Sequence, residues 1–286
     1  MREVKVMTED RVVTSTDYTM DVSLDFFNER MKIEDYRGNV ASIHKQIIRL
    51  LDEHPFTKVI VKSRQEDWKT FIELGYQFEA LYTGYFNGSD AYSMALFTEN
   101  SRRTSEYWIY EDETIEQVKE IPCTLELPNA PGYTVRKAEE KDAKELSNLY
   151  QAVFEIYPTP MNDPDYIEKL MKHDSIFYVA EFDGRIVSAA SADINPTYHN
   201  AELTDCATLP DHRKNGLMKI LIAKLENDLK EQQIYCVYSI ARALSFGMNA
   251  VFHQRKYVYT GRFTKNCNIY NKLEDMNLWI CDLSRR

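Results

Sequence analysis

The sequence predicts an α/β fold in which helices flank both faces of a mixed β-sheet, and three observations lead to this prediction. Strand-like and helix-like segments alternate along residues 131–286. The dipeptide Asp183-Gly184 separates two strand-like runs and favours the tight turn of an antiparallel hairpin. Residues 201–209 form a strand-like run that leads through a short basic loop into an amphipathic helix. Alternating elements with one tight hairpin are typical of a mixed sheet.

The elements expected in this region follow one another closely. A short strand at residues 133–138 precedes a helix that begins near Glu139 and carries apolar residues as far as Val153. One further helix follows the basic loop, with an apolar face that includes Leu221 and Leu225, and another spans 244–257. The remaining strands are expected at 176–182, 185–194, 201–209, 234–240, 258–263 and 276–283.

The loop between the strand at 201–209 and its helix has the character of a phosphate-binding site. Backbone N–H groups at the start of a helix point toward one spot, and the helix dipole adds partial positive charge there. The order Arg213-x-x-Gly216-x-Met218 is neither a Walker loop, which needs Gly-Lys-Ser/Thr, nor a dinucleotide fingerprint, which needs three glycines.

This strand-loop-helix junction resembles the Arg/Gln-x-x-Gly-x-Gly/Ala pyrophosphate loop of the GCN5-related N-acetyltransferases, the GNAT family. The resemblance implies a GNAT fold, a mixed and mostly antiparallel sheet with splayed central strands and flanking helices. It also implies that acetyl-CoA is the co-substrate and wedges between the strands at 201–209 and 234–240. The cofactor contacts implied are Leu209, Arg213, Lys214, Asn215, Gly216, Leu217, Met218 and Asn249.

Runs at 204–210, 247–252, 266–269 and 274–279 are similar to those of the β-lysine N6-acetyltransferases. That resemblance implies acetylation of the N6 amine of β-lysine, a small cationic amino acid, to make a compatible solute. Acetylation of another small amine or amino acid stays open. So does a non-catalytic acyl-CoA-binding sensor or scaffold, because Phe252 replaces a tyrosine that serves many GNAT enzymes as general acid.

Glu202 is the expected general base, since some family members carry a catalytic glutamate at this distance before the loop; a solvated carboxylate at a strand start is the alternative. Strand alternation would place Glu202, Thr204 and Cys206 on one face and Asp205 on the other. The side chains expected to select the substrate are Asp193, Asp205, Arg242, Asn266 and Asn268.

Composition narrows the class of protein. A formal net charge of −10 over 286 residues disfavours nucleic acid as a partner and suits a cationic small substrate. No long apolar run predicts a membrane span, and the first residues lack a targeting segment, so we expect a cytoplasmic protein. Five cysteines without a C-x-x-C pair, and histidines without metal-ligand spacing, predict free thiols and no metal site.

Residues 1–125 read as a separate α/β domain before a catalytic domain at 131–286. Strand-like pieces lie within 21–35, Asn39 can cap a helix, and Asn87-Gly88 predicts a hairpin turn. The segment 71–78 resembles 252–259, which implies a degenerate GNAT-like half without a phosphate loop; an unrelated α/β domain is the alternative. We expect this part to pack on the catalytic domain, joined to it by a linker with prolines at 122, 128 and 131.

Overall fold

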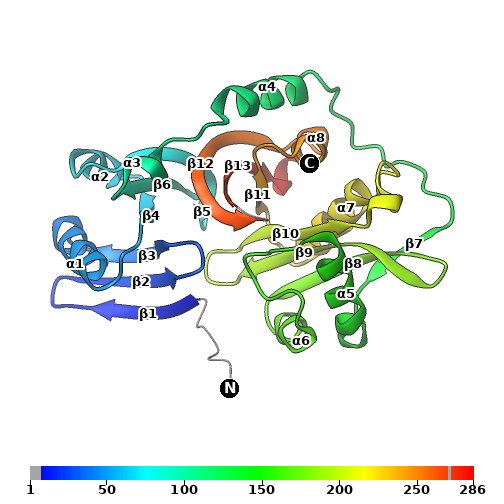
Figure 1. Cartoon of the computed structure of the whole chain (residues 1–286), viewed down its shortest axis with the longest axis horizontal. Coiled ribbons are helices and arrows are strands. Elements are labelled where there is room, and N and C mark those ends of the chain that lie inside the picture. Colours follow the sequence, from blue (N-terminus) through cyan, green and yellow to red (C-terminus); the bar gives the residue numbers. More distant parts are fainter. Residues whose placement is uncertain (1–7, 270–271) are drawn as a thin grey trace.

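In the computed structural model, which describes residues 8–269 and 272–286, one mixed sheet runs through the whole molecule. The thirteen strands of the described ranges lie in the order β1-β2-β3-β4-β6-β5-β12-β13-β11-β10-β9-β8-β7. Figure 1 shows the N-terminal half and the C-terminal half side by side, with β12 and β13 between them. The predicted mixed α/β architecture is confirmed.

The N-terminal half consists of a sheet with helices packed on one face. Residues Val59 and Val61 pack beneath the helices, and Asn39 caps the first helix by accepting a hydrogen bond from the N–H of Ser42. The elements are β1 (Thr8–Thr14), β2 (Tyr18–Asp25), β3 (Arg30–Gly38), α1 (Val40–Glu53), β4 (Lys58–Arg64), α2 (Trp68–Glu73), β5 (Gln77–Phe86), β6 (Ser89–Phe97), α3 (Asn100–Arg103) and α4 (Trp108–Lys119).

The C-terminal half carries helices on both faces of its strands. Adjacent residues Ile186 and Val187 of β9 point to opposite faces, the first into the core under α5 and α6 and the second into the core under α7. The elements are β7 (Tyr133–Lys137), α5 (Ala143–Val153), α6 (Pro164–Lys172), β8 (Ser175–Phe182), β9 (Arg185–Asn195), β10 (Asn200–Thr208), α7 (Leu217–Glu231), β11 (Cys236–Arg242), α8 (Phe246–Gln254), β12 (Val258–Ile269) and β13 (Lys272–Asp282). Short 3-10 turns lie at Glu140–Asp142, Pro210–His212 and Leu283–Arg285.

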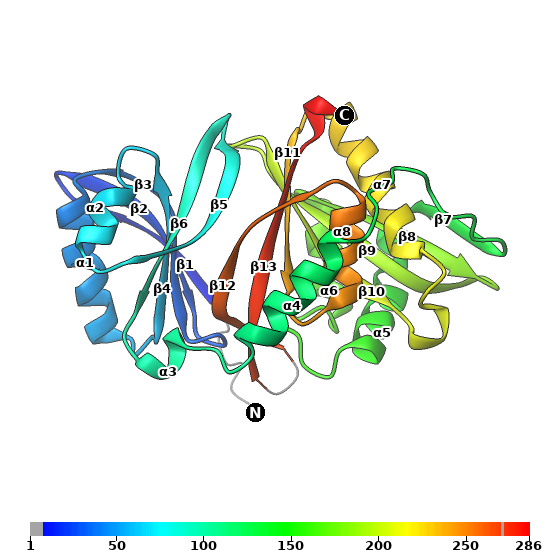
Figure 2. The same ribbon diagram turned by 90° about the horizontal axis from the view of Figure 1, so that it is seen from above.

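The two halves share one strand topology. Strands β2-β3-β4-β6-β5 follow the same spatial order as β9-β10-β11-β13-β12, and in both sets only the second and third strands pair in parallel. Figure 2 shows the two sets from above, with α1 and α2 at the outer edge of the N-terminal half. The correspondence expected between 71–78 and 252–259 therefore extends to the whole strand order.

The halves meet at β5 and β12 through a close approach of their backbones. Gly261 pairs with Ala80, and a Cβ atom on Gly261 would lie 2.1 Å from the carbonyl oxygen of Glu79. Its φ of +154° adds a conformation that side chains rarely adopt, so glycine is required here. This single bridge continues the sheet from one half into the other.

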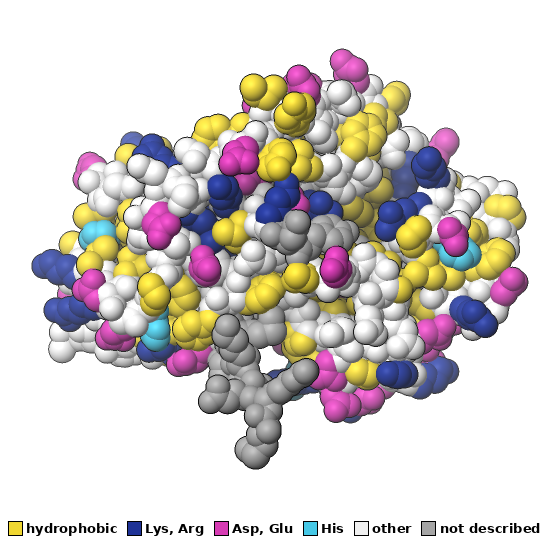
Figure 3. Space-filling model, viewed as in Figure 1, with side chains coloured by type: hydrophobic (Ala, Val, Ile, Leu, Met, Phe, Trp, Pro, Cys, Tyr) yellow, Lys and Arg dark blue, Asp and Glu magenta, His cyan; other side chains and the backbone are white. Residues whose placement is uncertain are grey.

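Several elements of the fold lie outside those expected from the sequence. Strand β1 and helix α6 have no counterpart in the expected set. Helix α4 begins at Trp108 and buries Ile115 and Val118 in the core beneath α7 and α8. None of the helices described is long and apolar enough to cross a membrane. On the face shown in Figure 3, acidic and basic side chains are interspersed.

Candidate active site

The loop before α7 contains a row of backbone donors that have no hydrogen-bond acceptor in the described part of the chain. Gly216 occupies the N-cap position in the left-handed region, with φ 71° and ψ 13°, and no side chain caps the helix. None of the described residues accepts a hydrogen bond from the backbone N–H groups of 214–218. Since these donors lie at the positive end of a long helix, they suit a pyrophosphate.

The side chains around this loop keep the donors accessible. Met218 turns into the hydrophobic core and is 9% exposed, so its bulk lies away from the loop. Arg213 is exposed, and its Nε donates to the carbonyl of Thr208 at 3.2 Å. The ring of Pro128 fills the space that a Cβ atom on Gly216 would occupy, at 2.3 Å. The linker thus packs against the loop at Gly216.

Asn249, expected beside the cofactor, lies fully buried in α8. Its amide nitrogen donates to the carbonyls of Arg242 and Ser245, and its amide oxygen accepts from Asn277 and from the indole of Trp279. Its hydrogen-bonding groups are therefore occupied within the protein, and its contact with a cofactor stays a prediction.

The parallel strands β10 and β11 separate shortly after they begin. They pair only from Asn200 to Glu202, with Glu202 opposite Tyr238. Beyond that point β10 contains a bulge. Thr204 pairs with Ser191 and Ala207 pairs with Ala189, so β10 advances by three residues while β9 advances by two. The separation opens the sheet next to the Glu202 carboxylate.

The bulge corrects the alternation expected for β10. Asp205 has a φ of +49°, and its side chain lines the same cavity as Glu202 and Thr204. Cys206 packs toward the core on the other face. Strict alternation was the wrong assumption, because the extra residue of a bulge reverses the facing of the residues that follow.

A cavity of about 670 Å³ lies over the separated strands, between the two halves of the chain. The C-terminal half contributes residues of β9–β13 and of the segment around Tyr157. The N-terminal half contributes residues of β1–β5, whose presence at the site no local pattern in the sequence predicted. The charged and polar lining of the cavity includes Lys32, Glu34 and Lys62 from the N-terminal half and Asp193, Glu202, Asp205 and Asn266 from the C-terminal half.

Three carboxyl groups form the wall of this cavity in the C-terminal half. Burial, and after it the charge of Asp193, raises the pKa of Glu202 to about 7. Burial and Asp193 also raise the pKa of Asp205 to about 7, although Ser191 and Tyr157 donate hydrogen bonds to its carboxylate at 2.7 and 3.1 Å. Burial raises the pKa of Asp193 as well, and Ser175 donates to it at 2.7 Å. A carboxyl group that titrates near neutral pH is suited to accept and release protons.

The Glu202 carboxylate differs from its two neighbours because none of the described residues donates a hydrogen bond to it. It faces the cavity directly opposite Asp193, with which its residue pairs across β9 and β10. A carboxylate without a donor inside a cavity is free to engage an ammonium group. The structure thus brings Glu202, Asp193 and Asp205 to one cavity, with Asp205 placed there by the bulge and against the expected alternation.

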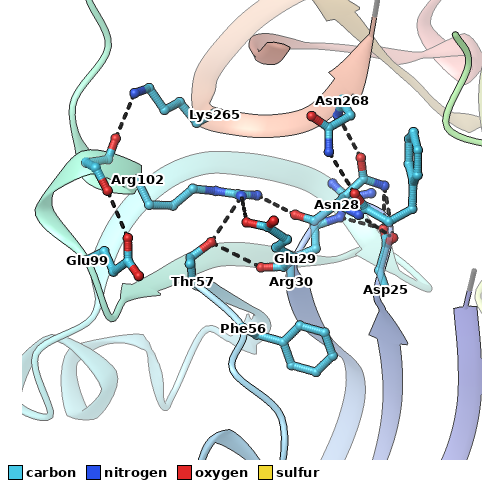
Figure 4. Close-up of polar contacts among 12 residues, drawn as sticks. Asp25, Asn28, Glu29, Arg30, Phe56, Thr57, Glu99, Arg102, Lys265 and Asn268 are labelled. Carbon is cyan, nitrogen blue, oxygen red and sulfur yellow. Dashed lines mark hydrogen bonds and ion pairs between the residues drawn. The ribbon is translucent and has the colours of Figure 1, made fainter. Parts of the chain in front are cut away.

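The other expected substrate residues lie apart from this group. Asn266 lines the cavity, and its backbone carbonyl accepts from Arg30 at 2.9 Å. Asn268 instead binds the N-terminal half: its N–H donates to Asn28 and its amide to the carbonyl of Phe27, as Figure 4 shows beside Asn28. Arg242 forms an ion pair with Glu274 at 3.3 Å and is not among the residues that line the cavity.

Comparison with known proteins gives consistent results. The acetyltransferase (GNAT) family matches residues 143–254. The chain is 38% identical to the N-acetyltransferase YodP of Bacillus subtilis, over 93% of this chain and 97% of that protein. It is also similar to two proteins named beta-lysine N(6)-acetyltransferase. That of Methanosarcina mazei is 34% identical, over 86% of this chain and 98% of its own, and that of Methanococcus maripaludis is 31% identical, over 94% and 98%.

Proposed function

This chain belongs to the acetyltransferase (GNAT) family and is an N-acetyltransferase, and we propose that it transfers the acetyl group of acetyl-CoA to the N6 amine of β-lysine. Two relatives that match nearly their full length carry that activity in their names. The observation that carries the proposal is a cavity at the separation of β10 and β11, where none of the described residues donates a hydrogen bond to the Glu202 carboxylate.

In this proposal the pyrophosphate of the co-substrate binds the open N–H groups of 214–218, with Arg213 nearby. Their lack of an acceptor among the described residues and the left-handed Gly216 fit an anion at the start of α7. Acetyl-CoA supplies an activated thioester when it is bound. Leu209 and Asn249 complete the predicted contact set.

Glu202 acts as the general base. The 6-ammonium of the substrate has a reference pKa near 10.4, so it must lose a proton before its nitrogen can attack. Glu202, with a pKa of about 7, accepts that proton directly or through one water. The new N–C bond forms as the C–S bond breaks, and the thiolate takes up a proton from water. Asp193 and Asp205 hold the ammonium beside the base.

We infer that residues 131–286 form the catalytic GNAT domain and that 1–125 form a degenerate GNAT-like domain. The shared order of strands supports a common architecture. The absence of a phosphate loop in the first half supports its degenerate character, since Asn39 alone lies between β3 and α1.

The decisive experiment is a thiol-release assay with acetyl-CoA and a panel of β-lysine, α-lysine, ornithine and spermidine. A site shaped for β-lysine leaves a polar group unpaired when α-lysine binds, which costs about 1–3 kcal/mol or about 5- to 150-fold in kcat/KM. We expect β-lysine to exceed α-lysine by that factor, with the product acetylated at N6 by NMR. Equal rates on both, or acetylation at the 3-amine, would contradict β-lysine as the substrate.

The second candidate is a protein that binds acyl-CoA without turnover. Phe252, buried in the core of α8, favours it because it cannot donate a proton to the leaving thiolate. Binding of CoA without thiol release across the whole panel would select this alternative.

A further inference from the structure

The N-terminal half contributes polar, apolar and charged side chains to the cavity wall, and two of its lysines, Lys62 and Lys32, act on the charge of Glu202. Lys32 Nζ lies 2.9 Å from Glu34 Oε1, and Lys62 Nζ binds the other oxygen of the same carboxylate. Lys62 also donates to the hydroxyl of Tyr85 at 2.9 Å and lies over its ring, 4.8 Å from the centroid. Together, Lys32, Glu34 and Lys62 make up the basic wall of the cavity.

Strand geometry explains why the basic wall faces the cavity. In β4, Val59 and Val61 point into the core beneath α1 and α2, so Ile60 and Lys62 point to the other face. In β3 the register shifts between the pairs Ile33–Val22 and Asp35–Asp21, which leaves Glu34 as the extra residue of a bulge. Alternation from Lys32 already places Glu34 on the cavity face, and the bulge then returns Tyr36 to the core on the other face.

The basic wall holds one more positive charge than negative charge. The buried pair nearby is different, because Lys58 meets Glu79 one to one at 2.9 Å. In the basic wall two lysines share one carboxylate: against the effect of burial, Lys32 and Lys62 hold the pKa of Glu34 well below its usual range. An excess cation in a partly desolvated cavity is costly unless an anion joins it.

The basic wall and Glu202 belong to one electrostatic environment. Although burial and Asp193 raise the pKa of Glu202, Lys62 and Lys32 act in the opposite direction. Among the described residues that line the cavity, the C-terminal side contributes only carboxylates as charged groups, whereas the N-terminal side contributes the cations Arg30, Lys32 and Lys62 together with Asp10, Asp25 and Glu34. Such a cavity complements a molecule that carries an ammonium at one end and a carboxylate at the other.

We propose that Lys32 and Lys62 bind the carboxylate of the amino-acid substrate and that Glu34 binds its second ammonium, while the amine to be acetylated lies at Glu202. This assignment rests on the proposed function and adds to it a specificity role for the N-terminal half. The half that lacks a phosphate loop then supplies the recognition of the substrate head group, and the half with the loop supplies the cofactor site and the base.

The test is a cycle between two substrates and two variants of the full chain. β-Lysine is compared with 1,4-diaminopentane, which is the same molecule without its carboxylate. Lys62→Met and Lys32→Met each remove one cation and leave Glu34 paired with the other lysine. Lys172→Met is the matched control, because Lys172 forms exposed ion pairs with Glu140 and Glu168 outside the cavity.

We expect each variant of the basic wall to lower kcat/KM for β-lysine by about 10- to 150-fold, the effect of losing one hydrogen bond to a charged group, mainly through KM. The rate on 1,4-diaminopentane should change by less than about threefold, and Lys172→Met should match the parent on both substrates. Unchanged CoA affinity and an unchanged melting temperature would show that the variants are folded.

Two results would overturn the inference while leaving the proposed function intact. The first is an equal loss on both substrates, which would give the lysines a structural role. The second is an unchanged KM for β-lysine. If the parent acetylates neither β-lysine nor any other amine that bears a carboxylate, the proposed function fails first, and that outcome is read from the parent alone.

Discussion

The two halves of this chain build the same five-strand order and differ most where the second strand of each set passes into its helix. In the N-terminal half, Asn39 alone separates β3 from α1, and its side chain satisfies the N–H of Ser42 at 3.0 Å. In the C-terminal half, residues 209–216 separate β10 from α7, and the helix begins at Gly216 without a side-chain cap. The start of α1 is capped by its own Asn39 side chain and is called the sealed helix start. The start of α7 has no such cap, can accept an anion and is called the open helix start.

A second difference lies on the cavity face of the paired parallel strands. Counted from the first parallel pair, the third residue of β3 is Lys32 and the third residue of β10 is Glu202. Equivalent positions of one topology therefore carry opposite charges across one cavity. Topology fixes where side chains point, whereas a few substitutions and one loop length decide what the site binds.

The largest effect is expected from Glu202→Gln, which removes the base. The residue at the equivalent position of the N-terminal half, Lys32, is left unchanged. We expect kcat/KM at neutral pH to fall by about 10²- to 10⁴-fold, the contribution of a positioned proton acceptor. Glu116→Gln, on the exposed side of α4, is the matched control. Parental rates for Glu202→Gln would move the role to Asp205.

The same carboxyl sets the expected pH dependence. Because burial and Asp193 raise the pKa of Glu202 to about 7, the base is protonated and inactive at a higher pH than an ordinary glutamate. We expect kcat/KM of the parent to fall about tenfold per pH unit below about pH 7, and to level off above it. This acidic fall in kcat/KM should be absent in Glu202→Gln. If it persists in that variant, the titrating group is Asp205.

The open helix start is tested by Gly216→Ala. The new Cβ atom would lie 2.3 Å from the ring of Pro128, and alanine disfavours the φ of +71°, so the loop must move. Loss of one charge-assisted hydrogen bond would weaken CoA binding by about tenfold or more in calorimetry. Gly184→Ala has a similar φ with open space around it and should bind CoA like the parent. If both variants bound CoA with equal affinity, the loop at Gly216 would not be part of the cofactor site.

The sequence predicted those parts of the molecule that depend on local signals. The hairpin turns at Asp183-Gly184 and Asn87-Gly88, the cap at Asn39 and the period of α7 all act through neighbouring residues, and each element formed as expected. Glu202 and Asp193 pair across neighbouring strands and line one cavity, whereas Asp205 reaches that cavity only through the bulge in β10.

What the sequence could not predict depends on contacts between distant segments. The continuous sheet rests on the approach of Gly261 to Ala80, and neither residue carries a local signal for it. In the sequence, Lys62 is an isolated lysine at the end of an apolar strand. Only the structure places it in one cavity with Glu202 of β10. The bulge at Asp205 is set by its pairing with β9 and not by its own sequence.

The junction itself is tested by Gly261→Ala. The added Cβ atom meets the backbone of Glu79 and Ala80, which cannot give way as a flexible side chain could. We expect a loss of roughly 1–3 kcal/mol in the free energy of unfolding, as for overpacked sites, measured by urea denaturation. Gly247→Ala, with open space in α8, is the control and should be neutral or stabilising by up to about 1 kcal/mol. An unchanged Gly261→Ala would mean that the two halves are not held at this bridge.

The smallest effect is expected at the sealed helix start. Asn39→Ala removes the side chain that accepts from Ser42, which costs about 1 kcal/mol of stability for a helix N-cap. Because this start faces no proposed anion, CoA affinity and kcat/KM should stay at the parental values while the urea midpoint falls. Gly216→Ala should show a loss of affinity that exceeds its loss of stability. If Asn39→Ala weakened CoA binding as well, the division of roles between the two helix starts would be wrong, because a cap that serves only its own helix has no path to the cofactor.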